Sequence, residues 1–535
     1  MTYKGRGLNG KYHGCIVRTA LLSRQIRTRM IDSAANLPVR FDHLYSRLVA
    51  LAELMHRHRW RVAALGAPIV ALVAIGISQW VLLDFPNSGD EYNYLYEAQT
   101  FAAGRLWNTP LSPADVFNTN YIVQEPSREF SSFPFGWPIA IAGALVLGLP
   151  PWIVNPVLGT LTLALVWALG ARLYDGRTGV IAAALVGSSP FFLFNAASYF
   201  SHTFCGALLL GAAFVASREE RSPPWVPMLV GFLIGWAVVA RYLTGVLCGV
   251  PIVFWLLRPG VPRVKTMALV AIGGLPWVGA LAAYNQAMTG NPLKLTTTAL
   301  TVSLWFRDGW LLRSADILSA HLLRHLLWTP AVLVPAYVIY LRSAPAANRR
   351  GPLDWILVVT VAVLYFYVER GGNQYGPRFH YEAFLFVVIF VAGNLFRADS
   401  LQASPPLDRW LFALLAANVV LMPISFAVHA AVEHRVVLER MDPFRRAAGL
   451  RDALVLIGDR VGATRSIAAP DLTRNGINPG GPVLYGLHID TPRHCPGGDL
   501  AVPGRTPYLY VWDYANGIGT LTPLECSASA TLPPR

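Results

Sequence analysis

The sequence has little charge for its length. Of its 535 residues only 14% are charged, whereas 54% are hydrophobic. A soluble protein of this size carries roughly a quarter charged residues. Apolar runs of about 18 to 22 residues recur between short charged loops, and runs of this length cross a bilayer as helices. The composition therefore excludes an ordinary soluble domain and predicts a multi-pass helical membrane protein.

The sequence also lacks the short motifs of several enzyme classes. It has no Gly-rich phosphate-binding P-loop, no HExxH, no GxSxG and no paired CxxC. ATP-driven transport and zinc proteolysis lose support accordingly.

Cysteine is scarce, with five residues in the chain. Cys205 and Cys248 lie in apolar runs, as buried thiols usually do. Cys495 and Cys526 lie in the polar C-terminal region and can pair if that region faces an oxidising compartment.

The basic residues are placed where they set membrane topology. The net charge is +14, but Lys and Arg gather in the N-terminal sixty or so residues and in the short loops between apolar runs, which argues against nucleic-acid binding. Residues 1–61 end in "HRHRWR" just before the first apolar run. This pattern predicts a basic cytoplasmic tail and places the next loop outside the membrane.

Five later basic loops, if all cytoplasmic, predict eleven crossings. The predicted spans are 62–83, 152–171, 179–197, 202–217, 225–240, 242–257, 266–286, 324–341, 353–368, 380–396 and 410–428. The short apolar run 135–151 is expected to lie in the interface, anchored by Trp137 and Trp152. The alternative is that this run crosses as well, which gives twelve crossings.

The predicted fold is an all-α polytopic membrane domain, residues 62–429, with interfacial helices in a long first outer loop, residues 84–151. Residues 430–535 contain strand-like runs such as "DALVLIGD" and "TPYLYVWDY" between polar turns. They predict a small extracytoplasmic α/β or β-rich domain, which either selects an acceptor or braces the membrane domain. Chemistry is expected on the outer face, where the long loops are.

The first outer loop opens with the acidic pair Asp90 and Glu91 in "SGDEYNYLYEA". Ser88 and Glu91 fit a capping box at the start of an interfacial helix, with Glu91 reaching back to the N-cap. Capping accounts for Glu91, although a catalytic role stays open. Asp90 is either a carboxylate stabilised by the helix dipole or a functional group: a general base, a metal ligand or a substrate anchor.

Three further candidates lie in short outer turns. His202, in "NAASYFSHTF", is either a substrate-binding residue or a hydrogen-bonded histidine at a helix end. Arg241 and Tyr242, in "AVVARYLTG", interrupt an apolar stretch, and an ionisable residue at membrane depth indicates function. An arginine there favours phosphate, or it extends from the interface to water.

The outer loop "VERGGNQYGPRFHYEAF" contributes Tyr375, Arg378 and Glu382 as substrate-binding candidates. Pro377 sets the start of the next helix. Arg378 would then lie beside the open backbone N–H groups of a helix N-terminus, which bind anions.

These features together resemble the GT-C superfamily of membrane glycosyltransferases. The similarity rests on the external Asp-Glu pair, the interfacial helix, "RLYDGRTGVIAAALVGSSPFF", "GFLIGWAVVARYLTGVL", "YNQAMTGNPLKLTT" and "GPRFHYEAF". The superfamily includes protein mannosyltransferases, lipid A aminoarabinose transferases and oligosaccharyltransferase catalytic subunits, and the chain is similar to its uncharacterised bacterial members. The likeness covers about residues 60 to 430, and the order of the motifs carries most of it.

The resemblance implies a transferase of the bacterial inner membrane that moves a hexosyl or pentosyl group from a polyprenyl-phosphate-linked donor. The acceptor is a glycan, a lipid or a protein. Asp90 would be the general base, and Arg241 and Arg378 would bind the donor phosphate. Many members have an acidic residue where this chain has Ser201-His202. We therefore predict no obligatory metal or other cofactor, although a divalent cation is allowed.

Two other functions remain open. The main alternative is a transporter or flippase of a lipid-linked sugar, which predicts internal repeats, charged residues at mid-span and broken helices. The sequence shows no repeat, and its ionisable residues gather on one face, which favours an enzyme. The second alternative is a non-enzymatic membrane assembly factor.

Overall fold

The computed structural model describes most of the chain after its basic tail. The described residues are 46–47, 50–218, 223–297, 310–330, 333–344, 346, 349–366, 374–395, 406–458, 460–478 and 480–526. Most of the predicted cytoplasmic tail, residues 1–61, lies outside them.

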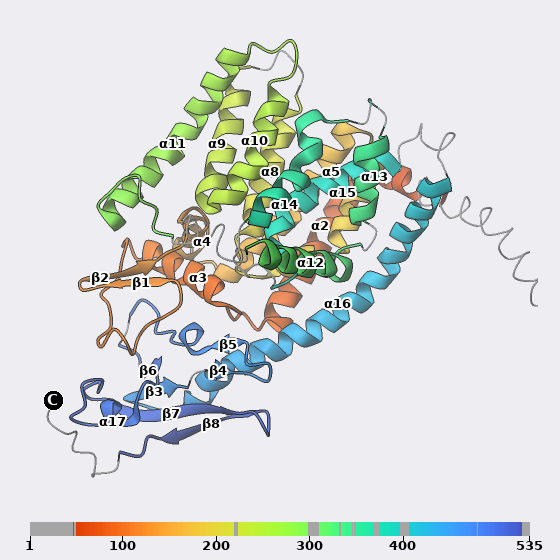
Figure 1. Ribbon diagram of the computed structural model, residues 1–535. Coiled ribbons are helices and arrows are strands. Elements are labelled where there is room, and N and C mark those ends of the chain that lie inside the picture. The colour runs from red at the N-terminus through yellow and green to blue at the C-terminus, as the bar shows by residue number, and fades with distance from the viewer. Residues whose placement is uncertain are drawn as a thin grey trace, which may run out of the picture.

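The chain is a multi-pass membrane protein with a predominantly helical body (Figure 1). Within the described residues, five helical segments are long and apolar enough to cross a membrane: Arg59–Val81, Pro151–Leu173, Arg263–Thr289, Arg378–Leu395 and Leu421–Ala447. Two bent helix pairs raise that number to seven if each pair is one span. The predicted number of eleven is not confirmed.

The helical body consists of helices in the following order. They are α2 (Arg59–Gly76) with a π-helical extension η1 (Ile77–Val81), α5 (Val154–Leu173), α6 (Gly176–Gly187), α7 (Pro190–Ala197), α8 (His202–Ala216), α9 (Trp225–Ala240), α10 (Tyr242–Leu256), α11 (Arg263–Thr289), α12 (Trp310–Trp328), α13 (Leu333–Ser343), α14 (Ile356–Phe366), α15 (Tyr381–Leu395) and α16 (Pro406–Ala447). Short 3₁₀ turns precede α5, α14 and α15: η2 (Pro151–Ile153), η5 (Gly351–Trp355) and η6 (Arg378–His380).

Two predicted spans are broken helices. The pair α6 and α7 bends by 69°, and the C-terminal half of α12 meets α13 at 108°. Pro190 is the first residue of α7, and Pro330 lies between α12 and α13. Proline disfavours a helical residue before it and removes a backbone donor. The spans predicted at 179–197 and at 324–341 therefore each correspond to a bent pair of helices.

Helices α9 and α11 touch at their backbones. A Cβ added to Gly231 of α9 would lie 1.9 Å from the carbonyl oxygen of Val270, and one added to Gly273 of α11 would lie 1.9 Å from that of Met228. Small residues allow this close approach of helices in membranes. The two helices run side by side in Figure 1.

The first loop, residues 84–151, forms a layer at one end of the helical body (Figure 1). It contains α3 (Gly89–Ala102), a hairpin of β1 (Ile122–Glu125) and β2 (Arg128–Ser131), and α4 (Gly136–Val146). The 11 residues of α4 reach about 16 Å at 1.5 Å per residue, whereas the hydrocarbon core is about 30 Å thick. This length agrees with the prediction that 135–151 does not cross.

Trp137 does not anchor α4 in the interface as expected. Its side chain is buried, and its Nε1 donates a hydrogen bond of 2.8 Å to the carbonyl oxygen of Tyr199. The tertiary contact with the turn before α8 holds it inside the protein.

The C-terminal region folds as a small α/β unit below the first loop (Figure 1). A four-stranded sheet has the order β6 (Val483–Leu487), β3 (Ala453–Ile457), β7 (Thr506–Asp513) and β8 (Ile518–Pro523). Strand β3 pairs in parallel with β6 and β7, and β8 pairs antiparallel with β7. The remaining elements are the pair β4 (Arg460–Val461) and β5 (Ile467–Ala468), a turn η8 (Ala469–Asp471) and α17 (Thr491–His494).

The sheet is covered on both faces. The side chains of β3 alternate between the two faces. Val455 and Ile457 pack in one cluster with Ala447 at the end of α16. Leu454 and Leu456 pack in another with Val116 and Phe117 of the first loop.

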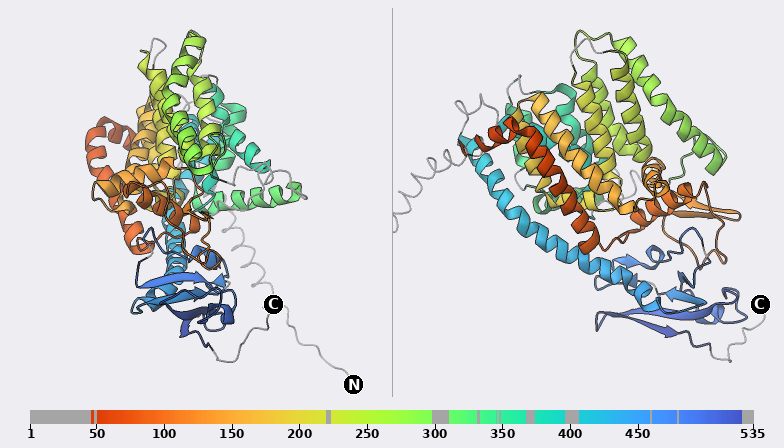
Figure 2. Two further views of the ribbon diagram at one scale, coloured as in Figure 1. Left: turned by 90° about the vertical axis from the view of Figure 1, so that its left-hand side faces the viewer. Right: turned by 180° about the vertical axis from the view of Figure 1, so that it is seen from behind.

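Helix α16 connects the two parts of the molecule. It passes along one side of the helical body to the sheet (Figure 2). The predicted boundary between residues 429 and 430 lies inside this helix.

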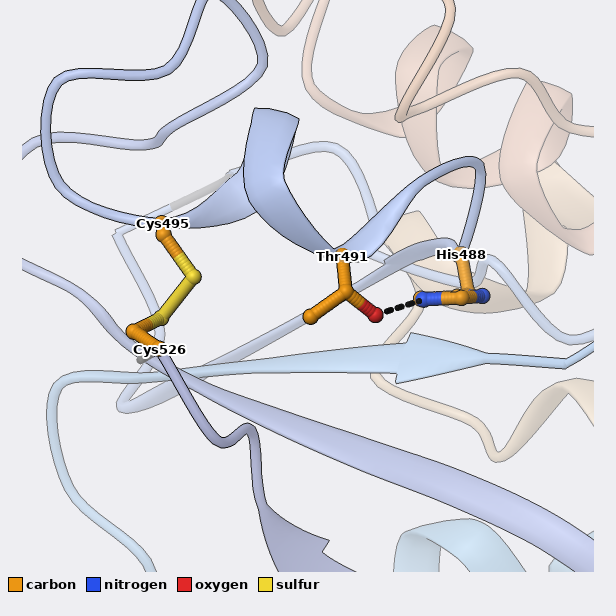
Figure 3. Close-up of a disulfide and its surroundings, with 4 residues drawn as sticks. All are labelled: His488, Thr491, Cys495 and Cys526. Carbon is orange, nitrogen blue, oxygen red and sulfur yellow. Dashed lines mark hydrogen bonds between the residues drawn. A yellow bond between two sulfur atoms is a disulfide. The ribbon is translucent and has the colours of Figure 1, made fainter. Parts of the chain in front are cut away.

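A disulfide closes the C-terminal region. Cys495, directly after α17, bonds to Cys526, which follows β8 (Figure 3). Before α17, His488 and Thr491 share a hydrogen bond of 3.1 Å between Nε2 and Oγ1 (Figure 3). The disulfide therefore joins the edge strand to the loop that follows β6.

Candidate active site

Four segments meet at the end of the helical body that faces the first loop. They are the N-terminal turn of α3, the turn 198–201 before α8, the junction of α9 and α10 at Arg241, and η6 at the start of α15. Ser88 starts α3 as predicted, since its hydroxyl accepts the backbone N–H of Glu91 at 3.1 Å. Asp90 and Glu91 thus lie in the first turn of a well-capped helix.

Asp90 and Arg378 form the central ion pair of the site. The Nη2 of Arg378 donates to Oδ2 of Asp90 at 2.6 Å, and the two side chains are 10% and 19% exposed. The guanidinium lies over the ring of Phe200, 4.1 Å from its centroid. Its Nε and Nη1 are buried without a hydrogen-bond partner. The short charged hydrogen bond to Asp90 thus uses one nitrogen of the guanidinium and leaves the other two, Nε and Nη1, buried without a partner.

Glu91 is held in the protein interior. Its Oε1 accepts the backbone N–H of Tyr199 at 2.9 Å, and its Oε2 accepts the Ser88 hydroxyl at 3.4 Å. The residue is 1% exposed. Burial raises the pKa of Glu91 to about 7, although the Tyr199 N–H and the charge of Arg378 oppose that shift. The carboxyl ties α3 to the turn before α8.

Arg241 ends α9 and caps α10, where the sequence predicted a turn. Its Nη1 donates to the Ser201 hydroxyl at 3.1 Å, which in turn lies 3.1 Å from the hydroxyl of Tyr94. Its Nε lies 3.3 Å from Oε1 of Glu382. The arginine is thus fixed from two sides.

His202 and Glu382 lie behind Arg241. The His202 Nδ1 is 3.3 Å from the same Oε1 of Glu382, and both side chains are fully buried. Neither reaches a surface that substrate can approach in this conformation. Glu382 thus contacts both Arg241 and His202, while the predicted direct contact of His202 and Glu382 with substrate stays a prediction.

Tyr375 and Tyr242 complete the predicted set. Tyr375 is fully buried with a φ of 56°, and its ring stacks on Phe194 at 5.7 Å and meets Phe200 edge-on at 5.6 Å. It thus supports the ring that carries Arg378. Tyr242 is nearly buried, and its hydroxyl has no hydrogen-bond partner. A buried hydroxyl without a partner is costly, and the predicted contact of Tyr242 with substrate stays a prediction.

No group of three His, Cys, Asp or Glu side chains in the described part of the chain is arranged to hold an ion. Asp90 directs one oxygen to Arg378, and a cation there would have to displace a guanidinium. The absence of an obligatory metal stays a prediction.

Sequence reasoning missed several residues that shape the site. Asp84, at the end of the first apolar run, accepts the Tyr199 hydroxyl at 2.5 Å, and burial raises its pKa. Arg474 of the C-terminal unit reaches the turn before α3. The position of Asp84 after a span was a usable signal, whereas no local pattern marked Arg474.

Comparisons with known proteins bear on the fold. No protein-family model matches the sequence, and no curated protein matches it. The structure is similar to ArnT from Cupriavidus metallidurans in the apo state, with 14% identity and a TM-score of 0.50 over 80% of this chain and 86% of that chain. The same protein bound to undecaprenyl phosphate gives 13% identity and a TM-score of 0.48 over 79% and 85%.

A third similar structure is the arabinofuranosyltransferase AftD from Mycobacteria. It has 17% identity and a TM-score of 0.41 over 81% of this chain and 32% of that chain. The likeness to apo ArnT shows a shared fold. At 14% identity this likeness shows the fold alone, in agreement with the fold that the sequence resemblance implied.

Proposed function

We propose that the chain is an integral-membrane glycosyltransferase. It moves a hexosyl or pentosyl group from a polyprenyl-phosphate-linked donor to a hydroxyl or amide of a glycan, lipid or protein acceptor. Asp90 is the general base, and Arg378 and Arg241 bind the donor phosphate.

The observation that carries the proposal is the state of Arg378. One of its nitrogens holds the only carboxylate of the α3 turn that solvent reaches, and two others are buried and unused. An arginine fork binds phosphate through parallel N–H groups. Buried donors that lack a partner cost stability, and phosphate oxygens that accept from the N–H groups of Nε and of Nη1, which lie on different edges of the guanidinium, would remove that cost. The phosphate and the base would then share one guanidinium.

This arrangement suits glycosyl transfer. Asp90 accepts the proton of the acceptor as the acceptor atom forms its bond to the anomeric carbon. The bond from that carbon to the phosphate oxygen breaks, and the polyprenyl phosphate leaves with both electrons. Arg378 and Arg241 stabilise the negative charge that grows on the leaving oxygen. The N–H groups are already fixed by Phe200, Ser201 and Glu382.

The proposal places the reaction on the outer face of the bacterial inner membrane. The site, the first loop and the C-terminal unit lie at the same end of the helical body (Figure 1). That unit contains the Cys495–Cys526 disulfide, and disulfides persist in oxidising compartments. The basic tail before the first span supports the same orientation.

One observation supports the transporter alternative. The two bent helix pairs are the broken helices that a transporter uses to bind its substrate. A flippase, however, has no need of a base beside the phosphate-binding arginine. The two functions therefore differ in what they require of Asp90.

The test is the variant Asp90→Asn, with Asp115→Asn as the matched control because Asp115 is an exposed carboxylate in the same loop. Glycolipids, glycoproteins and lipid-linked sugars are compared by mass spectrometry in cells that lack the protein and carry each variant. We expect Asp90→Asn to lose at least about 100-fold of the transfer activity, as removal of a general base does, and its lipid-linked donor to accumulate. Asp115→Asn restores the wild-type profile.

The enzyme proposal would be contradicted if Asp90→Asn folds at the wild-type level and leaves both the glycan profile and the donor pool unchanged. A donor pool trapped on the cytoplasmic leaflet would instead support a flippase.

A further inference from the structure

Arg474 belongs to the C-terminal unit but binds the turn that begins α3. Its side chain is nearly buried, at 9% exposure. Its Nη1 donates to the carbonyl oxygen of Pro86 at 2.7 Å, and its Nη2 donates to that of Ser88 at 3.2 Å. Its Nε donates to the carbonyl oxygen of Asp471 at 2.6 Å. One guanidinium thus joins two carbonyls of the turn to its own loop.

Two aromatic rings from the first loop enclose the same guanidinium. Its carbon lies 4.8 Å from the ring centroid of Phe85 and 5.1 Å from that of Tyr92. The Tyr92 hydroxyl accepts the backbone N–H of Gly476 at 3.1 Å. Residues 474–476 therefore contact the start of α3 through both the Arg474 side chain and the Gly476 backbone.

Packing alone does not explain a charged residue here. The N-terminus of a helix carries the positive end of the helix dipole, where a cation is unfavourable. All three hydrogen bonds of Arg474 go to neutral carbonyls. Burial lowers the pKa of Arg474 to about 10. A residue whose burial costs stability, as that of Arg474 does, is expected at a place where function requires it.

The carbonyls that Arg474 binds lie in the turn that leads into Asp90. The Ser88 carbonyl also accepts the backbone N–H of Tyr92 at 3.1 Å, which is the first hydrogen bond of α3. Asp90 is the second residue of that helix. A rotation of the turn would therefore move its carboxylate relative to Arg378.

We propose that Arg474 is a positioning residue, which fixes the 86–88 turn so that Asp90 faces Arg378. The C-terminal unit is then part of the active-site framework rather than an acceptor-binding appendage. This inference rests on the proposed function, because Asp90 must be the base for its direction to matter.

The interface has other contacts that survive the loss of Arg474. The Asn120 Nδ2 donates to Oδ1 of Asp471 at 2.6 Å, and the hydroxyls of Thr119 and Thr473 lie 2.9 Å apart. Leu454 and Leu456 pack against the first loop. A change at Arg474 is therefore expected to loosen the turn and leave the unit docked.

The experiment compares Arg474→Met and Arg474→Lys with Arg440→Met. Arg440 is equally buried and binds Oδ2 of Asp471 at 3.4 Å in the same loop. Arg440 contacts Asp471 rather than the 86–88 carbonyls, so its variant controls for loss of a buried arginine. Each purified protein is assayed for kcat and donor KM and for backbone hydrogen exchange.

We expect kcat of Arg474→Met to fall by about 100-fold, the cost of misplacing a catalytic group by about 1 Å, while the donor KM changes by less than about twofold. Exchange of the amides in 86–93 rises, and strands β3 and β7 keep their protection. The kcat of Arg474→Lys is expected to lie between those of the wild type and Arg474→Met, because an ammonium cannot donate to both carbonyls as the planar guanidinium does. Arg440→Met keeps kcat and leaves the turn protected.

Two results overturn the inference. Wild-type kcat with a protected turn in Arg474→Met shows that the contact has no positioning role. Loss of protection in β3 and β7 of both Arg474 variants shows a purely structural role. An active Asp90→Asn variant would instead overturn the proposed function, whereas an inactive Asp90→Asn with an active Arg474→Met overturns the inference alone.

Discussion

Asp90 and Glu91 are neighbours with opposite environments. Asp90 keeps 19% of its side chain exposed, while Glu91 is buried and raised in pKa to about 7. The carboxyl of the pair that solvent reaches is therefore the one that lies against Arg378. Glu91 serves the fold, since it accepts the Tyr199 N–H that orders the turn before α8.

The raised pKa of Glu91 makes stability depend on pH. Because the folded protein binds the proton more tightly than the unfolded chain, the contribution is full below pH 4.5 and lost as pH rises to about 7. The shift corresponds to about 3 kcal/mol. Glu91→Gln keeps an acceptor oxygen and has no charge to bury. We expect its melting temperature to exceed that of the wild type increasingly between about pH 5 and pH 8.

Thermal unfolding in detergent at several pH values measures this difference, with Asp115→Asn as the exposed-carboxyl control. Curves for wild type and Glu91→Gln that stay parallel across the range would contradict the prediction.

Local sequence gave the candidate residues but not their partners. The capping pattern correctly marked Ser88 as the N-cap of α3. The partner of Glu91 lies 108 residues away and that of Asp90 lies 288 residues away. Arg378 was singled out by its place beside a predicted helix N-terminus. Its pairing depends on tertiary packing, which no local pattern encodes.

At the scale of elements, apolar length predicted helices better than it predicted their continuity. The spans near 152–171 and 266–286 are present as α5 and α11. Hydropathy averaged over a window cannot register a single Pro190 or Pro330, although each separates two helices. The bends matter because α7 leads directly into the turn 198–201 that contacts Glu91.

The backbone contact between α9 and α11 gives a prediction for two glycines on one helix. A Cβ on Gly273 would meet the Met228 carbonyl oxygen at 1.9 Å, whereas one on Gly279 meets nothing within 4 Å. We expect Gly273→Ala to destabilise the protein by about 1–3 kcal/mol through overpacking. Gly279→Ala is neutral or stabilising by less than about 1 kcal/mol.

Thermal unfolding of the two detergent-solubilised variants compares them directly. Equal melting temperatures for Gly273→Ala and Gly279→Ala would show that the helices do not meet as described.

At the scale of the whole molecule, the C-terminal region is less independent than its sequence suggested. The strand pattern predicted a small α/β or β-rich domain, and a small sheet is present there. The contribution of Val116 and Phe117 to its core could not be predicted, because these residues lie in a turn-rich stretch more than three hundred positions before β3. Contacts of such separation leave no periodic signal in either segment.

The disulfide of this unit gives a test of its stability and its compartment. Cys495 and Cys526 are 31 residues apart, and closure of a loop of that length stabilises by about 3–4 kcal/mol. We expect the double variant Cys495→Ser, Cys526→Ser to lose about 3–4 kcal/mol of free energy of unfolding and therefore to have a lower melting temperature.

In intact cells, a thiol reagent should label Cys495 and Cys526 only after reduction. Free thiols at these positions in cells would contradict an oxidising compartment, and with it the proposed outer orientation.

The joint core of the first loop and the sheet also has a consequence for synthesis. Thr119 and Thr473 touch but are separated by 354 residues. At 5–20 residues per second, the ribosome needs roughly 20 to 70 s to make the intervening chain. During that time the turn that presents Asp90 has no partner for its carbonyls. Chains that stop before Arg474 would lack the guanidinium that binds the carbonyls of Pro86 and Ser88, and under our proposal they would insert in the membrane without becoming active.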